Sequence, residues 1–417
     1  MMSTELRSHP RRSGAWPLAS ALLLTWAAAA CTSSSPPDQL ELEGQAFSPY
    51  DPAATGDLLT TSATQISPSL AEATPLTTLT RDELALALRP AVFHPTGQLF
   101  IADEPNYDAA DDVLDGIESP THVVSPSGQP RDGAPLAGAS APLILGSTDD
   151  RNAVLNPDYP RDAIARVLLY ADVDGDDPRG WCTASFIGPW TALLAGHCLR
   201  FPDGEIARRL TFETARHGTE LPFNSFTCVN GDASSSNDLY WAVPAGFMED
   251  MNPALDFAVI DTYPCDFAPA EFDGYIVNAL DLDPIDVYGY SVDACEGVPD
   301  LEAYEPGTYQ CGMRGSAQAD EWRLQSDHID TDAGWATCPD DVLNPPPRGM
   351  SGAPWYFEVP PPINSYTDWR VAGVDIGFRV IDDPTRCNPT RAPCVSNVAR
   401  RIDDTFDAFI RFVSFDF

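Results

Sequence analysis

Short hydrophobic runs recur along the last two thirds of the chain, from Ile144 to the C-terminus. Each run is about as long as a β-strand, and clusters of Gly, Pro, Asn and Asp separate neighbouring runs. Runs of this length between turn residues are typical of an all-β barrel or sandwich. The runs that we assign to strands are 166–173, 184–188, 191–195, 210–214, 256–262, 285–290 and 369–380.

The end of the chain has a different spacing. Apolar positions at intervals of three and four residues indicate an amphipathic helix. We therefore expect a β-rich domain over residues 144–417 that ends in a helix. The side chains on the expected helical face are Val398, Ile402, Phe406, Phe409, Ile410 and Val413.

Residues 31–143 show little hydrophobic periodicity. Thr, Ser, Pro and Ala dominate this segment, and acidic residues are scattered through it. Such a composition is typical of poorly structured chain. A helical pattern occurs only at 81–88. We expect a low-complexity tether, a pro-segment, or both.

Residues 1–30 have the features of an export signal. Three arginines precede an apolar run over 16–30, which is too short to span a membrane easily. The run ends in Ala28-Ala29-Ala30-Cys31, which resembles a bacterial lipoprotein box with Ala28 in place of the usual Leu. Because a Thr/Ser/Pro-rich stretch follows, we expect Cys31 to be lipidated. The alternative is ordinary signal-peptidase cleavage after Ala30.

The formal net charge of −38 limits the possible partners. Nucleic acids and anionic membrane surfaces bind through clustered Lys and Arg, which this sequence lacks. We therefore expect no nucleic-acid partner, and membrane attachment only through a lipid on Cys31. The sequence contains neither an HExxH nor a CxxC motif, and we expect no metal and no cofactor.

Ten cysteines in an exported chain indicate an oxidising compartment and disulfide bonds. If Cys31 is acylated, an odd number is left for pairing. A bond between Cys182 and Cys198 would close a loop of about 15 residues and stabilise the fold by roughly 3 kcal/mol. Proximity along the chain suggests three further pairs, with Cys338 free: Cys228–Cys265, Cys295–Cys311 and Cys387–Cys394.

A histidine stands directly before Cys198, in the segment Ala195-Gly196-His197-Cys198. A disulfide at Cys198 would hold this loop still. An imidazole that acts as a general base needs such rigidity, because it must stay within hydrogen-bond reach of its partner. Taken alone, a histidine beside a cysteine is more often a packed or exposed side chain.

Two other segments carry candidate chemistry. Ser351 lies between Gly349 and Gly352, and glycines there permit a tight turn whose backbone N–H groups converge on an oxyanion. Asp256 begins an apolar strand, where a buried carboxylate needs a partner such as a histidine N–H group. The alternatives are a simple Gly/Ser turn and a solvent-facing aspartate at a strand edge.

Together, these segments resemble the trypsin/chymotrypsin superfamily of serine peptidases, with His, Asp and Ser in that order along the chain. The resemblance is carried by residues 182–198, 256–260 and 349–354. It is closer to the bacterial glutamyl-endopeptidase branch, because residues 144–151 resemble the start of a mature enzyme of that branch. The likeness covers residues 144–417 and leaves out the N-terminal third.

The resemblance implies two six-stranded antiparallel β-barrels with an active site between them. It implies that His197 takes the proton of Ser351 and that Asp256 orients His197. The backbone N–H groups of Gly349 and Ser351 would form the oxyanion hole, and water would hydrolyse the acyl-enzyme. The expected protein is a monomeric serine endopeptidase that acts on proteins or peptides.

The sequence departs from the branch at the substrate pocket. Its strand Asp375-Ile376-Gly377 has Asp375 where the branch has a histidine that helps to bind glutamate. A carboxylate would repel a glutamate side chain. If Asp375 lines the primary pocket with Ile376 and Gly377, it favours a Lys or Arg side chain. The alternative is that Asp375 points elsewhere and bonds to the backbone.

Other departures leave an inactive protein as an alternative. Met350 stands where the family has Asp or Asn, and residues 333–347 look like an insertion in the pocket wall. Both also fit a catalytically inactive, surface-anchored binding lipoprotein. The presence of all three triad residues counts against that reading. In either case we expect an exported protein, anchored in the cell envelope (outer membrane or cell surface) or secreted.

A candidate Ca²⁺ site is the acidic segment Asp172-Val173-Asp174-Gly175-Asp176-Asp177. Alternating carboxylates can supply oxygen ligands. The glycine is misplaced for an EF-hand, however, and Thr183 stands where the closing glutamate should be. We therefore expect a solvated hairpin tip.

Overall fold

The computed structural model divides the chain into residues 1–36 and 37–417, and all described residues belong to the second unit. The expected signal and Cys31 lie outside the described residues. No helix among the residues described is both long and apolar enough to cross a membrane. The structure describes residues 40–42, 45–49, 76–93, 99–116, 122–124, 152–201, 205–229, 241–263, 265, 268–280, 282–291, 295, 298–299, 305–320, 322–326, 350–359, 368–381 and 394–413.

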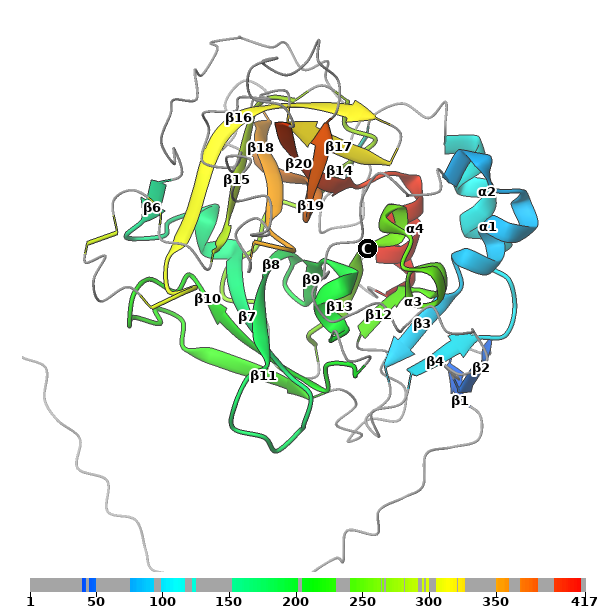
Figure 1. Cartoon of the computed structure of the whole chain (residues 1–417), viewed down its shortest axis with the longest axis horizontal. Helices are drawn as coiled ribbons and strands as arrows, with labels where there is room; N and C mark the ends of the chain where they lie inside the picture. The colour runs from blue at the N-terminus through cyan, green and yellow to red at the C-terminus, as the bar shows by residue number, and fades with distance from the viewer. Residues whose placement is uncertain are drawn as a thin grey trace, which may run out of the picture. The chain divides into compact units, whose positions relative to one another are not determined.

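The C-terminal half contains a closed ring of six antiparallel strands (Figure 1). Pairing of β18 with both β15 and β19 closes the ring. Apolar side chains such as Leu282, Ile285 and Trp355 fill its core. In ring order the strands are β15 (Leu282–Tyr290), β16 (Gln310–Asp320), β17 (Arg323–Ser326), β20 (Cys394–Arg401), β19 (Asp368–Ile381) and β18 (Pro354–Val359). Three short strands border the ring: β5 (His122–Val124), β6 (Asn152–Val154) and β14 (Tyr275–Val277).

The other half is built on an eleven-stranded sheet. Every residue of β9 and β13 is buried, which explains why these strands appear in the sequence as continuous apolar runs. In spatial order the strands are β1 (Leu40–Leu42), β2 (Gln45–Pro49), β4 (Leu99–Ala102), β3 (Pro90–Phe93), β12 (Trp241–Pro244), β13 (Ala258–Asp261), β9 (Thr191–Leu194), β8 (Gly180–Gly188), β7 (Ile164–Tyr170), β10 (Arg209–Thr214) and β11 (Ser225–Val229).

The predicted all-β class with a C-terminal helix is confirmed. The helix α4 (Asp404–Val413) begins where the Asp403 carboxylate accepts a hydrogen bond from the backbone N–H of Phe406, at 3.0 Å, as an N-cap does. Its apolar face is buried, and Phe406 stacks on Phe257 with ring centres 4.0 Å apart. The expected helical face began too early, because Val398 belongs to strand β20.

Part of the N-terminal third is folded, beyond the one helix expected at 81–88. The predicted helix at 81–88 is present as α1 (Arg81–Ala87), which starts with a capping box between Thr80 and Glu83. A second helix, α2 (Tyr107–Gly116), and strands β1 to β5 also lie in this segment. These elements are short, and short helices depend on tertiary packing more than on their own sequence pattern.

Four 3-10 helices and one further α-helix complete the described elements. Two of the 3-10 helices, η5 (Gly196–Leu199) and η6 (Pro253–Leu255), carry or precede candidate catalytic residues. The α-helix α3 (Ala245–Asp250) lies between β12 and η6 in the chain. The other two 3-10 helices are η3 (Leu76–Thr78) and η4 (Arg161–Ala163).

The backbone of the acidic segment at 172–177 accepts hydrogen bonds from an arginine side chain. The guanidinium group of Arg209 donates to the carbonyl oxygens of Val173, at 2.8 Å, and Gly175, at 2.5 Å. Within the described part of the chain, no group of three His, Cys, Asp or Glu residues is arranged to hold a metal ion. The segment therefore has the form of a loop closed by an arginine.

Candidate active site

His197 lies in η5, directly after the buried strand β9. The disulfide Cys182–Cys198, with sulfur atoms 2.04 Å apart, ties this 3-10 helix to β8. The structure also contains Cys228–Cys265 and Cys295–Cys311, which are the other described pairs that proximity in sequence suggested. Cys338 and Cys387 lie outside the described residues. His197 is therefore held in place by a covalent bond at the neighbouring residue.

Asp256 follows η6 and makes two hydrogen bonds to His197. Its Oδ2 atom lies 2.7 Å from His197 Nδ1, and its Oδ1 atom accepts from the His197 backbone N–H at 2.9 Å. The exposed fractions are 8% for His197 and 1% for Asp256, so water does not compete for these bonds. Because an ionised carboxylate only accepts, Nδ1 carries the proton, and Nε2 keeps the lone pair of the neutral ring.

The surroundings of His197 favour its charged form. Burial alone lowers the pKa of the imidazole, but the charge and hydrogen bond of Asp256 and the nearby Asp375 carboxyl outweigh burial and raise that pKa above its usual value. An imidazolium that forms here is therefore stabilised. This is the electrostatic requirement for a base that accepts a proton during a reaction.

Ser351 lies in a tight turn before β18. The backbone N–H of Ala353 donates to the carbonyl oxygen of Met350 at 2.8 Å, which closes the turn. Gly352 has a φ of +87°, and a Cβ atom there would lie 1.9 Å from the carbonyl oxygen of Thr183. Only glycine fits this position.

The Ser351 turn packs against the strand that carries Cys182. The Thr183 backbone N–H donates to the carbonyl oxygen of Ser351 at 2.8 Å, and Cys198 Sγ lies 3.9 Å from the same oxygen. The structure thus brings Ser351 next to the residues that flank the disulfide and His197. Gly349, the other expected oxyanion donor, lies outside the described residues, so that assignment stays a prediction.

Strand β19 runs beside the Ser351 turn and carries the three residues expected to line a substrate pocket. Backbone hydrogen bonds of 2.7 and 2.8 Å connect Asp375 to Gly352 and Ala353. The Asp375 side chain is 3% exposed, and its Oδ2 atom accepts from the indole N–H of Trp355 at 3.2 Å. Ile376 is buried as well, whereas Gly377 is partly exposed.

Burial raises the pKa of Asp375 to about 8, although the Trp355 hydrogen bond and the charge of His197 both oppose this rise. The carboxyl group is therefore largely protonated at neutral pH. In the described structure it accepts a hydrogen bond from the Trp355 indole, and a backbone hydrogen bond at Gly377 also opposes the rise of its pKa. Pocket lining by 375–377 stays a prediction.

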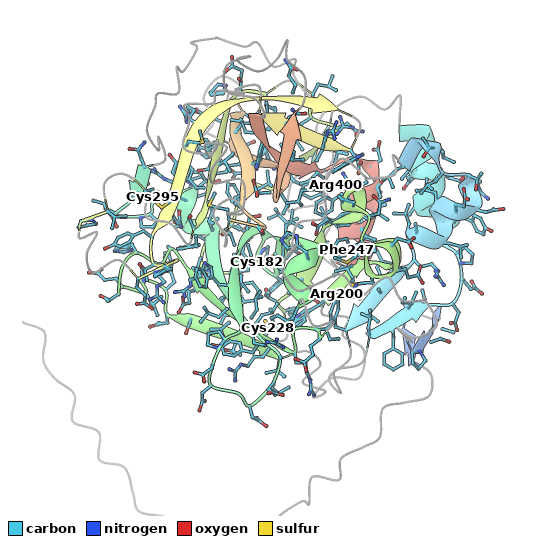
Figure 2. All side chains as sticks on the ribbon, viewed as in Figure 1. Cys182, Arg200, Cys228, Phe247, Cys295 and Arg400 are labelled. Atoms are coloured by element: carbon cyan, nitrogen blue, oxygen red, sulfur yellow. A yellow bond between two sulfur atoms is a disulfide. The ribbon has the colours of Figure 1, made fainter. Side chains whose placement is uncertain are left out.

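The sequence interpretation missed a buried arginine behind Asp256, labelled in Figure 2. Arg400 is fully buried and donates to the carbonyl oxygen of Ala254 at 2.5 Å, two residues before Asp256. It also donates to the carbonyl oxygen of Trp322 at 3.0 Å and pairs with the Asp403 carboxylate at 2.9 Å. The signal in the sequence was an arginine within an apolar pattern near the C-terminus. Catalytic motifs do not include such a residue.

Comparison with known proteins gives similarity in structure only. No protein-family model matches the chain, and no curated protein matches it in sequence. A solved Glu endopeptidase has a TM-score of 0.41 at 17% identity, covering 64% of this chain and 98% of its own.

Two other solved proteases give similar values. A thermostable serine protease, AL20, from an extremophilic microorganism has a TM-score of 0.38 at 14% identity and covers 61% of this chain and 97% of its own. Protease Anisep from Arthrobacter nicotinovorans has a TM-score of 0.37 at 14% identity and covers 62% and 98%. The chain is thus similar in structure to a Glu endopeptidase and to two other proteases over less than two thirds of its length.

Proposed function

We propose that the chain is a serine endopeptidase with His197, Asp256 and Ser351 as its catalytic triad. The observation that carries the proposal is the buried contact of 2.7 Å between His197 Nδ1 and Asp256 Oδ2, beside the turn that presents Ser351. A histidine that is fixed on one side by a carboxylate and lies near a serine turn is the arrangement that nucleophilic acyl transfer needs.

In the proposed reaction, the Ser351 Oγ atom attacks the carbonyl carbon of a peptide bond and its proton moves to His197 Nε2. Asp256 stabilises the imidazolium ion, and backbone N–H groups of Gly349 and Ser351 stabilise the oxyanion. The C–N bond then breaks, and His197 returns its proton to the leaving amine. Water hydrolyses the ester by the same steps, which releases the acid and restores Ser351.

Export belongs to the same proposal. Three disulfides are typical of proteins that fold in an oxidising compartment. We infer a signal over residues 1–30 and a lipid on Cys31, so that the protein stays at the cell envelope. Mass spectrometry of the N-terminal peptide from a membrane fraction tests this inference. A mature N-terminus at Cys31 or later, without lipid, would contradict it.

The experiment for the activity is labelling with a fluorophosphonate probe, which reacts only with an activated serine hydroxyl. We expect the chain from residue 32 onward to be labelled and Ser351→Ala to stay unlabelled. Asp256→Asn should slow the labelling by about 10⁴-fold, because the histidine then adopts the wrong tautomer. A wild-type protein that is folded but unlabelled would refute the proposal and favour an inactive binding protein.

A further inference from the structure

Helix α3 contacts both the loop that carries His197 and the loop that carries Asp256. A Cβ atom added at Gly196, beside His197, would lie 3.1 Å from the ring of Phe247 on α3. A Cβ atom added at Gly246 would lie 2.8 Å from the side chain of Leu255, which precedes Asp256. Both loops therefore pack directly on this one helix.

An arginine strengthens the link between α3 and the His197 loop. Arg200 follows η5 and donates through Nη1 to the carbonyl oxygen of Met248 at 3.0 Å. Figure 2 labels Arg200 and the α3 residue Phe247. A shift of α3 would therefore move the supports of His197 and Asp256 together.

Part of the N-terminal third also packs on α3. We call residues 76–93 and 99–116 the N-terminal cover. The backbone N–H of Ala245, the first residue of α3, donates to the carbonyl oxygen of Arg89 at 2.8 Å. The Arg89 guanidinium group pairs with the Glu249 carboxylate at 3.1 Å. Ala87 lies 2.8 Å from a Cβ atom added at Gly246, so α1 packs closely on α3.

The N-terminal cover also completes the sheet next to α3. Strand β3 pairs antiparallel with β12, with Val92 opposite Ala242 and Ala91 opposite Val243. Without β3, the edge of β12 would expose unpaired backbone groups, which is a cause of aggregation. The cover therefore satisfies backbone hydrogen bonds of the domain as well as packing on it.

Burial shows that the N-terminal cover shares the core of the larger sheet. Leu84 and Ala85 of α1, Leu88 directly after it and Phe100 of β4 are fully buried in the same apolar cluster as Phe247 and Leu255. Helix α2 packs on α4 in the same way. Loss of the cover would return these side chains to water, which is unfavourable in proportion to the apolar surface exposed.

We propose that the N-terminal cover is a permanent part of the folded unit, which positions the His197 and Asp256 loops through α3 and stays bound if the chain is cut between the cover and β6. The positioning role rests on the proposed peptidase function, whereas the retention of the cover does not. A removable pro-segment would instead leave a complete sheet and core behind.

Retention is tested on the chain from residue 32 onward, with a recognition site for a specific protease inserted in the Gly/Pro/Ser-rich stretch 125–143. After cleavage, we expect the two fragments to elute together in gel filtration and to separate only in denaturant. Separation under native conditions would overturn the proposal. Fragments that stay together but are never labelled by the fluorophosphonate would refute the peptidase function and leave retention standing.

Positioning is tested with Arg89→Gln and a matched control, Arg81→Gln. Arg81 also lies on the N-terminal cover, but its ion pair with Asp111 is exposed and does not involve α3. We expect Arg89→Gln to lower kcat by about tenfold with little change in KM, since small misplacements of catalytic groups cost up to about 100-fold.

A spectroscopic reading separates positioning from stability alone. The low-field proton signal of His197 Nδ1–H reports its hydrogen bond to Asp256. We expect this signal to shift or broaden in Arg89→Gln and to stay unchanged in Arg81→Gln. If both variants keep the wild-type signal and kcat, and differ from wild type only in thermal stability, the positioning role is wrong.

Discussion

At the scale of single residues, two buried carboxyl groups act on His197. Asp256 accepts hydrogen bonds from its ring and its backbone, whereas Asp375 interacts with it only electrostatically. The difference matters because burial raises the pKa of Asp375 to about 8. The contribution of Asp375 to the raised pKa of His197 therefore grows as the Asp375 carboxyl group ionises above neutral pH.

The raised pKa of Asp375 predicts how stability depends on pH. The folded state holds this proton more tightly than the unfolded chain, in which the pKa is near 3.9. The stability that the proton contributes is present below about pH 4 and is lost as pH rises through about 8. Asp375→Asn should therefore gain stability relative to wild type between pH 5 and pH 8.5. Urea unfolding at pH 5 and pH 8.5 measures the difference in stability between the variant and wild type. An equal difference at both pH values would contradict the raised pKa of Asp375.

At the scale of elements, the candidate site depends on contacts between segments far apart in the chain. The Ser351 turn bonds to Thr183 on β8, and the disulfide Cys182–Cys198 joins that strand to η5. Arg400 of β20 supports η6 from behind and lies 5.3 Å from the ring centre of Phe257. Each candidate catalytic residue is thus held by an element other than its own.

Arg400→Met should be severely destabilising. It would leave the Asp403 carboxylate and the carbonyl oxygens of Ala254 and Trp322 without this partner, and breaking a buried ion pair costs about 3–5 kcal/mol. The control is Arg179→Met, because the Arg179–Glu205 pair is exposed and such pairs contribute at most about 1 kcal/mol. Free energies of unfolding from denaturant titrations compare the two variants. Similar losses of unfolding free energy in the two variants would show that the contacts of Arg400 stabilise the fold no more than an exposed ion pair does.

At the scale of the whole molecule, the dominant property is the charge of −38. Such an excess of one sign keeps a protein soluble but opposes its compact state by self-repulsion. The arginines of the described ion pairs, such as Arg89–Glu249 and Arg166–Glu213, are already counted in this net charge, so the excess of carboxylates remains.

Added salt should therefore stabilise this protein at neutral pH. The screening length falls from about 10 Å at 0.1 M to about 3 Å at 1 M, which weakens repulsion between carboxylates. We expect the midpoint of urea unfolding to rise over this range at pH 7. The rise should become small at pH 4, where many carboxylates are protonated. A fall in the midpoint at pH 7 would show that attractive pairs outweigh the repulsion.

Local sequence information was sufficient for several features. The helical pattern at 81–88 and the apolar face of α4 depend on residues close in the chain, and both helices are present. The Cys182–Cys198 pairing and the need for a glycine beside Ser351 also follow from local spacing, and both occur in the structure. The resemblance of three short segments to serine peptidases pointed to His197, Asp256 and Ser351 as candidate catalytic residues.

Only the tertiary structure decided the rest. The 2.7 Å contact between His197 and Asp256, the buried state of Asp375 and the place of Arg400 all depend on residues brought together from distant parts of the chain. The N-terminal cover is the clearest case. Apart from α1, its elements were not predicted from the hydrophobic pattern, and burial on α3, α4 and β12 stabilises them. Sequence determines which local elements can form, whereas burial against distant partners determines which of them do.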